Sequence, residues 1–238
     1  SSDLVEIQGA RSQQCAAIQS TGRLVLLGAS MITTNAAETH GGGVCVLGGS
    51  AYFSGADLRF NHAAQGGGLY VADGAVAESS NGYITFNTTT GAGAGAYVAA
   101  GGQLTSSATG WVENAAAEDD PAGAGGAIYN AGAVTLYADV MTQNRAYAGG
   151  GIYNAGALTV TRSDIERNRA AAAGGGLHNA GTARFATSSL VSNEAADGAG
   201  FYSSAALAVV NATVADNRAA HSGNEVAGGD ATITYSTV

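Results

Sequence analysis

The feature that most constrains this chain is an internal repeat of about 25 residues. Eight asparagines recur at intervals of 26, 26, 27, 30, 24, 25 and 24 residues, each with an apolar residue three positions before it. An alanine lies two positions after each of them except the third, where Thr89 stands. These ladder asparagines are Asn35, Asn61, Asn87, Asn114, Asn144, Asn168, Asn193 and Asn217. The register predicts structural units that stack on one another along one axis.

Within each unit, short apolar segments alternate with polar or small residues, as in Val134/Leu136 and Leu158/Val160. This period of two is typical of strands, whereas helical repeats need longer segments of period 3.6. Glycine-rich phrases such as Gly149-Gly150-Gly151-Ile152-Tyr153-Asn154 separate the strands. We therefore expect three short strands and three turns per unit, which is one turn of a single-stranded parallel β-helix of about nine coils.

The composition agrees with a narrow interior. The chain of 238 residues holds 37 Gly and 51 Ala, with one Pro, so it is neither collagen nor a protein with a bulky core. Stacked asparagine amides are expected to hydrogen-bond along the ladder, and asparagine also tolerates the left-handed conformation of a sharp turn. No uninterrupted apolar stretch is long enough for a transmembrane helix.

A single β-helix domain is expected over residues 1–238. We predict an irregular first coil over residues 1–29, regular coils over 30–217 and an incomplete last coil over 218–238. The segments Asp3–Gln8 and Ala231–Val238 both resemble strands, and this suggests head-to-tail assembly in which the N-terminal strand of one subunit completes or covers the last coil of the next. A longer passenger protein of which this chain is a part is the alternative.

The phrase Gly-Gly-Gly/Ala-Ile/Leu, together with Phe60-Asn61 and Phe86-Asn87, resembles the repeats of polymorphic outer-membrane proteins. These are bacterial surface proteins whose passenger regions form right-handed parallel β-helices of the pectate-lyase-like class. The resemblance covers roughly residues 30–217 and implies a right-handed coil and an extracellular or cell-surface location. A signal peptide would then have been removed or would lie outside this chain.

Charge and chemistry argue against several functions. The chain has 18 acidic residues, nine arginines and no lysine, so binding to nucleic acid or to an anionic membrane is not expected. Resemblance to β-helical polysaccharide lyases would imply a Lys or Arg base, often with calcium. Hydrolysis needs paired carboxylates, but these are scattered along the chain. The scattered carboxylates are Asp57, Asp73, Glu78, Asp139, Asp164 and Glu166. We expect no catalytic residue and no cofactor.

Two candidate sites emerge. Glu118, Asp119 and Asp120 lie in the longest unit, where three carboxylates suggest a weak Ca²⁺ site or, alternatively, a solvated acidic loop. An aromatic row follows the inward Ile or Leu of successive units and should point outward. It binds a sugar or a partner chain, or it only stacks on itself. This predicted binding or assembly face comprises Tyr70, Tyr97, Tyr129, Tyr153, His178 and Tyr202.

The sequence does not decide whether the two cysteines, Cys15 and Cys45, are paired. A pair of cysteines in a secreted protein is often joined by a disulfide. In the repeat register, however, Cys15 aligns with Gly149 and Cys45 with Tyr153. Four residues of extended strand span about 13 Å, beyond disulfide reach. A regular first coil therefore predicts free thiols, and a bridge would indicate a separate N-terminal cap.

Together these features predict a non-catalytic, extracellular or cell-surface structural or adhesive solenoid. Its expected partners are itself, in head-to-tail filaments, or surface glycans and proteins. The alternative is a carbohydrate-binding or polysaccharide-cleaving β-helix.

Overall fold

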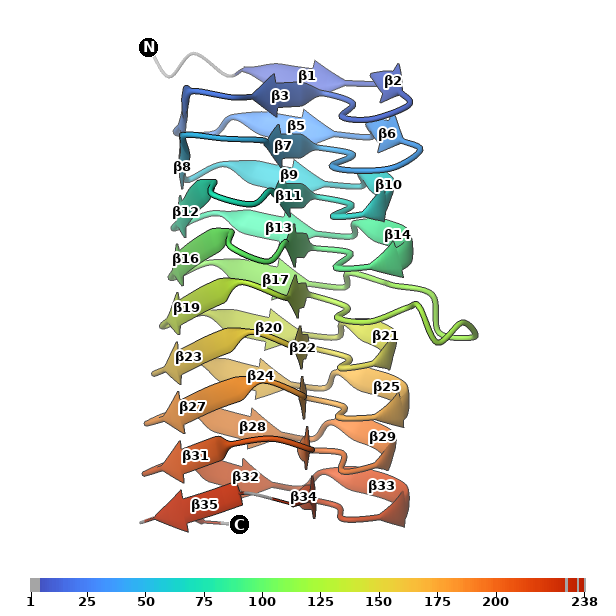
Figure 1. The fold of residues 1–238 in the computed structure, drawn as a ribbon, viewed down its shortest axis with the longest axis vertical. Helices are drawn as coiled ribbons and strands as arrows, with labels where there is room; N and C mark the ends of the chain where they lie inside the picture. Colours follow the sequence, from blue (N-terminus) through green and yellow to red (C-terminus); the bar gives the residue numbers. More distant parts are fainter. Residues whose placement is uncertain (1–4, 230, 235, 238) are drawn as a thin grey trace.

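The alternating apolar residues form the strands of a parallel β-solenoid of about nine coils, which confirms the predicted fold class (Figure 1). The computed structural model describes residues 5–229, 231–234 and 236–237. Every strand pair in this part of the chain is parallel, because each strand pairs with its counterparts one coil away. The described residues contain no helix, and therefore none that is long and apolar enough to cross a membrane.

Each coil passes through four sheet positions, which we call sheets A, B, C and D in chain order. Sheet A contains β1 (Glu6–Gln8), β5 (Met31–Thr33), β9 (Asp57–Arg59), β13 (Tyr83–Thr85), β17 (Gly110–Val112), β20 (Val140–Thr142), β24 (Asp164–Glu166), β28 (Ser189–Val191) and β32 (Thr213–Ala215). Sheet B is divided into B1, with β2 (Arg11–Ser12), β6 (Ala36–Ala37), β10 (His62–Gln65) and β14 (Thr88–Ala92), and B2, with β21 (Arg145–Ala148), β25 (Arg169–Ala173), β29 (Glu194–Asp197) and β33 (Arg218–Ser222).

Sheets C and D run the whole length of the rod. Sheet C contains β3 (Ile18–Ser20), β7 (Val44–Val46), β11 (Leu69–Val71), β15 (Ala96–Val98), β18 (Ile128–Asn130), β22 (Ile152–Asn154), β26 (Leu177–Asn179), β30 (Phe201–Ser203) and β34 (Val226–Gly228). Sheet D contains β4 (Arg23–Leu27), β8 (Ser50–Ser54), β12 (Val76–Ser80), β16 (Gln103–Ser107), β19 (Ala133–Tyr137), β23 (Ala157–Thr161), β27 (Thr182–Ala186), β31 (Leu207–Val210) and β35 (Ala231–Thr234).

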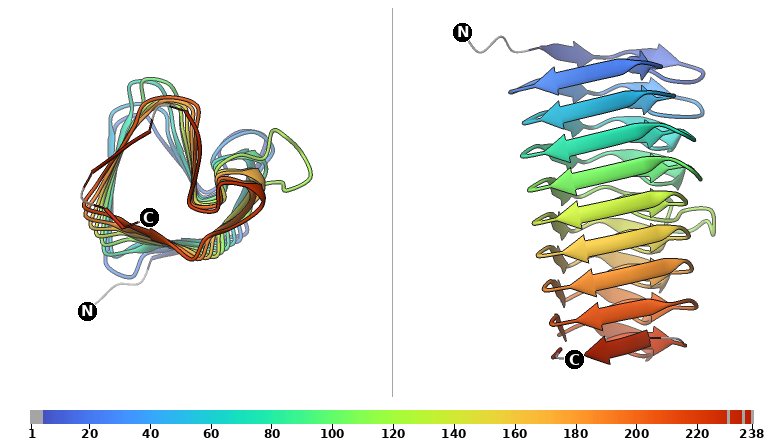
Figure 2. Two further views of the ribbon diagram at one scale, coloured as in Figure 1. Left: turned by 90° about the horizontal axis from the view of Figure 1, so that it is seen from below. Right: turned by 60° about the vertical axis from the view of Figure 1, so that its left-hand side comes forward.

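The outline of a coil is indented on one side (Figure 2). Sheets A, C and D enclose the core, whose middle residues, such as Trp111, Leu104 and Ile128, are almost fully buried. Sheet B adds a smaller lobe whose interior is mainly alanine, as at Ala146 and Ala170. The indentation therefore lies between sheets B and C, where the glycine-rich phrase turns the chain back.

The ladder asparagines form the expected stack of amides. The Oδ1 atom of Asn168 accepts hydrogen bonds from the backbone N–H of Asn144, at 3.0 Å, and from its Nδ2, at 2.9 Å. The Nδ2 atom of Asn168 also donates to the carbonyl of Met141 and to Asn193 Oδ1. This pattern satisfies turn groups that would otherwise be buried without partners, because the ladder amides themselves are buried.

One detail of the ladder prediction is wrong. The left-handed conformation falls on the residue before each ladder asparagine and not on the asparagine itself, which needs ordinary φ to point its amide inward. The left-handed residues are Thr34, Phe60, Phe86, Glu113, Gln143, Arg167, Ser192 and Asp216, with φ between 53° and 59°. Their side chains project from the corner between sheets A and B, so the fold accepts many residue types there at a backbone cost of about 1–2 kcal/mol each.

Strands β1, β2, β3 and β4, which lie in the segment expected to be irregular, each pair in parallel with the second coil. The described part of the last coil pairs through β33, β34 and β35. The two segments expected to mediate head-to-tail assembly are only partly described. Residues 1–4, 235 and 238 lie outside the described residues.

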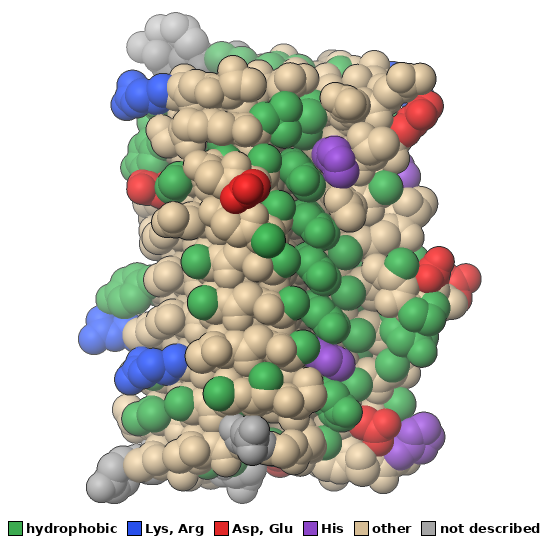
Figure 3. All heavy atoms as spheres, in the orientation of Figure 1, with side chains coloured by type: hydrophobic (Ala, Val, Ile, Leu, Met, Phe, Trp, Pro, Cys, Tyr) green, Lys and Arg blue, Asp and Glu red, His purple; other side chains and the backbone are tan. Residues whose placement is uncertain are grey.

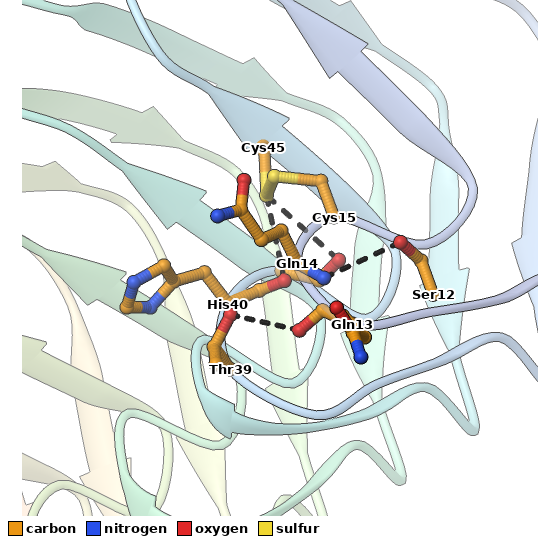
Figure 4. Close-up of a disulfide and its surroundings, with 8 residues drawn as sticks. Ser12, Gln13, Gln14, Cys15, Thr39, His40 and Cys45 are labelled. Carbon is orange, nitrogen blue, oxygen red and sulfur yellow. Dashed lines mark hydrogen bonds between the residues drawn. A yellow bond between two sulfur atoms is a disulfide. The ribbon is translucent and has the colours of Figure 1, made fainter.

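The prediction of free thiols is wrong, because Cys15 and Cys45 form a disulfide with their Cα atoms 5.8 Å apart (Figure 4). The register itself is as expected, since Ala16 N–H donates to the Gly41 carbonyl and so places Cys15 opposite Gly41. The error was to treat the next four residues as extended. They turn back so sharply that a Cβ on Gly41 would lie 2.3 Å from Cys45 Sγ. The bridge thus joins two regular coils, and no separate cap is needed to explain it.

Candidate functional site: an aromatic groove

The predicted aromatic row lies on sheet C along the indented side of the rod. Tyr70, Tyr97 and Tyr129 are aligned across β11, β15 and β18, and Tyr153 follows on β22. His178 on β26 and Tyr202 on β30 continue the row. Each ring is about half-buried, and its neighbours in the strand point into the core, so the row faces outward as predicted. Figure 3 shows the resulting band of hydrophobic side chains along the hollowed middle of this face.

A second column of residues lies beside the rings. It is formed by the last position of sheet B in each coil, directly before the glycine-rich turn, and its members pair in register. The column comprises His40, Gln65, Ala92, Ala124, Ala148, Ala173 and Asp197. The central part of this column consists of four alanines, whereas His40 at one end stacks on Tyr70 with ring centroids 4.4 Å apart.

We call the space between these two columns the aromatic groove. Its floor is the row Tyr70, Tyr97, Tyr129, Tyr153, His178 and Tyr202, and the second column is its wall. Near the middle, Pro121 and Ala122 of the long loop between sheets B1 and B2 add a further side to the groove. They enclose a hollow of about 290 Å³ with Tyr97, Tyr129 and Tyr153.

The rings of the floor stack on one another. Successive tyrosine centroids are 5.5, 4.8 and 5.3 Å apart from Tyr70 to Tyr153, and the ring planes differ by at most 10°. Tyr153 stacks on His178 at 4.6 Å. Each ring face inside the row is therefore turned toward another ring, and a ligand in the groove meets ring edges and phenol hydroxyls.

The groove is a poorly solvated environment. Burial raises the pKa values of Tyr70, Tyr97 and Tyr129, and the neighbouring phenols add to the effect at Tyr97 and Tyr129. Burial lowers the pKa of His178, and a hydrogen bond with the Ala173 backbone acts in the opposite direction. The raised pKa values keep the phenols of Tyr70, Tyr97 and Tyr129 protonated, so their hydroxyls remain hydrogen-bond donors.

The acidic loop does not bring its three carboxylates together. Glu118 contacts Arg145 at 3.2 Å and Arg169 at 3.5 Å, while Asp120 Oδ1 accepts the N–H of Ala122 and closes the turn. Within the described ranges, no three His, Cys, Asp or Glu side chains are grouped as a metal site would need. The bridging role of Glu118 between two arginines was not foreseen, because it depends on how the loop folds back over sheet B2.

Three of the other predicted carboxylates each contact a neighbouring side chain. Asp57 faces Arg59 at 3.6 Å, Glu166 faces Arg167 at 2.6 Å, and Asp164 accepts a hydrogen bond from Ser189. Asp139 is 1% exposed and so cannot reach a substrate. Arg145, Arg169, Glu194 and Arg218 are in register across sheet B2, as the sequence indicated.

The wall of the groove was missed because an alanine before a glycine-rich turn has no chemical signature. The only signal in the sequence was position, since each of these residues directly precedes a glycine-rich turn. In successive phrases they are His40, Gln65, Ala92, Ala124, Ala148, Ala173 and Asp197. A bulge shifts the register within sheet B, and this shift places the last residue of each strand in line with its counterpart one coil away.

Comparison of the chain with protein-family models, with curated proteins and with solved structures found no match. The parallel β-solenoid is therefore established by the structure alone. The resemblance to polymorphic outer-membrane protein repeats stays a prediction from short sequence phrases.

Proposed function

We propose that this protein is a non-catalytic, extracellular structural or adhesive β-solenoid that contacts its partner through the aromatic groove. The observation that carries the proposal is the row of half-buried rings whose wall is lined by alanine over four coils. A row that served only to stabilise the rod would not need an open side. Stacking across coils holds the rings rigid, so little side-chain entropy is lost when a partner binds.

Two further observations support this proposal. The disulfide suits an oxidising compartment such as the cell surface. Asp57 and Glu166 contact neighbouring arginines and Asp164 accepts a hydrogen bond from Ser189, so these three carboxylates are engaged locally, which favours a binding role over hydrolysis.

The test is a retention assay on surfaces coated with gelatin, cellulose, chitin or mucin. The matched variants are Ala173→Gln, which narrows the groove, and Ala171→Gln, which places the same side chain elsewhere on β25. Ala173→Gln should fold, because Gln65 already occupies this column. At least one surface should retain the wild type and the Ala171 variant but lose most of the Ala173 variant. Retention by no surface, or equal retention of the two variants, would overturn the proposal.

Head-to-tail assembly, in which the end of one subunit covers the end of the next, is a separate proposal. Sedimentation of the intact chain over a range of concentrations should show oligomers that grow with concentration. A constant monomer would contradict the assembly without affecting the groove.

A further inference from the structure

The chemistry of the groove limits what can occupy it. Its floor offers ring edges and a line of phenol hydroxyls, because the ring faces are turned toward each other. A sugar that stacks on aromatic faces would find them already occupied. An extended β-strand needs a free sheet edge for its backbone, whereas the groove presents side chains of sheet C, whose strands are already paired on both sides.

The row of tyrosine hydroxyls suits a partner peptide whose backbone carbonyls are free to accept hydrogen bonds. A polyproline II segment has no internal hydrogen bonds and presents its carbonyls outward, and such segments bind aromatic-lined grooves in other recognition domains. We propose that the aromatic groove binds a proline-rich segment in the polyproline II conformation, flanked by arginine or lysine. This inference rests on the proposed binding function of the groove and names the class of its partner.

The repeat distances agree with this partner. One turn of polyproline II is three residues of about 3.1 Å, or about 9.3 Å. Two coils of the solenoid are about 9.6 Å apart, since neighbouring strands are separated by about 4.8 Å. A segment lying along the rod would therefore return the same face to every second ring, for example to Tyr97 and Tyr153. Several tyrosines can then donate to equivalent carbonyls.

Charge complementarity gives the flanking residues. Asp119 and Asp120 lie on the loop that borders the middle of the groove through Pro121. Asp197 stands in the wall near the end of the groove at Tyr202, where it accepts a hydrogen bond from Ser222 and lies 3.9 Å from His221 Nδ1. The chain has no lysine. The arginines of sheet B2 are the first residues of their strands, whereas the wall of the groove is formed by the last residues of these strands. The apolar groove is thus bordered by carboxylates on the loop and in the wall, and these attract a cationic partner.

The experiment uses the full chain and a synthetic peptide of two arginines followed by about ten prolines. This length spans about 31 Å of polyproline II, roughly six coils. Isothermal titration should show binding by this peptide and none by a Gly-Ser peptide with the same two arginines. Tyr129→Phe, which keeps the ring and removes the donor, should weaken binding about 3- to 10-fold, as expected for one hydrogen bond. Tyr83→Phe on sheet A is the matched control and should bind like the wild type.

Asp119→Asn combined with Asp120→Asn should weaken binding and reduce its dependence on salt. The inference is overturned if the proline-rich peptide does not bind, or if it binds equally well to the Tyr129 and Tyr83 variants. Binding of cello- or chito-oligosaccharides in a manner abolished by Ala173→Gln, without peptide binding, would overturn it in favour of a glycan partner. That result would leave the proposed function intact, whereas loss of every groove-dependent contact would remove both.

Discussion

The two halves of the rod end sheet C in different ways. In the coils of β7, β11 and β15, the last residue of the strand is Val46, Val71 or Val98, each buried in the core. The turn that follows is closed by the backbone itself, as when the N–H of Ala75 donates to the carbonyl of Ala72. These coils therefore use an apolar residue and a longer turn.

In the coils of β18, β22 and β26 the same position holds Asn130, Asn154 and Asn179. Asn130 Oδ1 accepts the N–H of Gly132 at 3.0 Å, so the side chain closes a turn of only two residues. Asn130 Nδ2 donates to Asn154 Oδ1 at 2.8 Å, and Asn154 donates in turn to Asn179. A buried amide is stable here because each neighbouring coil supplies its partner.

A second inner column changes in the same region of the rod. At the corner between sheets D and A, the first half has Ala56 and Gly82 after a single buried Ser30, while Thr109, Asp139 and Ser163 form a polar row in the following coils. Sheet B divides into B1 and B2 nearby, at the long loop. The comparison teaches that buried amide and carboxyl side chains come in rows, whereas an isolated buried hydroxyl such as that of Ser30 can bond to a carbonyl of its own coil.

The largest expected effect on stability concerns Asp139, the residue of these polar rows that is least well stabilised in its charged form. Burial raises the pKa of Asp139 to about 7, although the N–H of Thr109 donates to its Oδ1 and opposes this effect. Ser106 lies close enough to oppose the rise as well, but within the described part of the chain neither Asp139 Oδ2 nor Ser106 Oγ has a partner with full hydrogen-bond geometry. Because the folded carboxyl binds a proton more tightly than the unfolded one, this group stabilises the fold fully below about pH 4 and loses that contribution as the pH rises through about 7.

Asp139→Asn should remove the loss of stability that ionisation of this buried carboxyl causes. The gain in the free energy of unfolding relative to wild type should be on the order of 4 kcal/mol at pH 8 and should vanish near pH 4, as the pKa difference implies. Urea titrations of both proteins at several pH values measure it. A gain that does not depend on pH would show that Asp139 is neutral or solvated in the fold.

The next effect separates the two kinds of turn. A Cβ on Gly156, in the short turn, would lie 2.1 Å from the Gly132 carbonyl oxygen of the preceding coil. Gly74 in a longer turn has φ of 68° and nothing within 4 Å of an added Cβ. Gly156→Ala should cost about 3 kcal/mol or prevent folding, while Gly74→Ala should cost about 1 kcal/mol through its φ alone. Similar urea midpoints for the two variants would contradict the distinction.

Two reciprocal substitutions at the end of sheet C test whether a buried amide needs amide partners in the neighbouring coils. Val71→Asn buries an amide between Val46 and Val98, neither of which can accept or donate through its side chain. We expect a loss of about 2 kcal/mol from the unpaired amide. Asn154→Val leaves Asn130 Nδ2 without Asn154 Oδ1 and should cost a similar amount. If Val71→Asn is silent in equilibrium unfolding, the first half tolerates polar interior residues and the comparison fails.

The smallest effect concerns a feature that both halves share. Glu113 and Ser192 both have left-handed backbone, with φ of 53° and 58°. Glycine removes the cost of that conformation but adds entropy to the unfolded chain, so each substitution to glycine should stabilise the fold by about 0.5–1 kcal/mol. Thermal unfolding of Glu113→Gly and Ser192→Gly checks this. A gain in only one half would mean that the corners differ as well as the turns.

The disulfide adds a chemical check on the first half. Thiol titration of the denatured, unreduced protein should find no free thiol, because Cys15 and Cys45 are joined. Two titratable thiols would restore the original inference from the register and would weaken the case for an oxidising compartment.

The sequence by itself determined the repeat, the parallel coil and the inward stack of ladder asparagines. Each of these follows from a period that recurs many times, because stacked coils place equal positions at equal sites. The outward direction of Tyr97, Tyr129 and Tyr153 followed from the same rule, since their strand neighbours are buried.

Only the tertiary structure decided how far apart positions lie across a turn. The disulfide was misjudged because the four residues after Gly41, which lies opposite Cys15, fold back on themselves, and no count of residues reveals that angle. For the same reason the sequence could not show that Ala148 and Ala173 border the rings, or that Glu118 bridges Arg145 and Arg169. Periodicity fixes which residues stack along the axis of a solenoid, while the path of the backbone within one coil decides which residues meet across it.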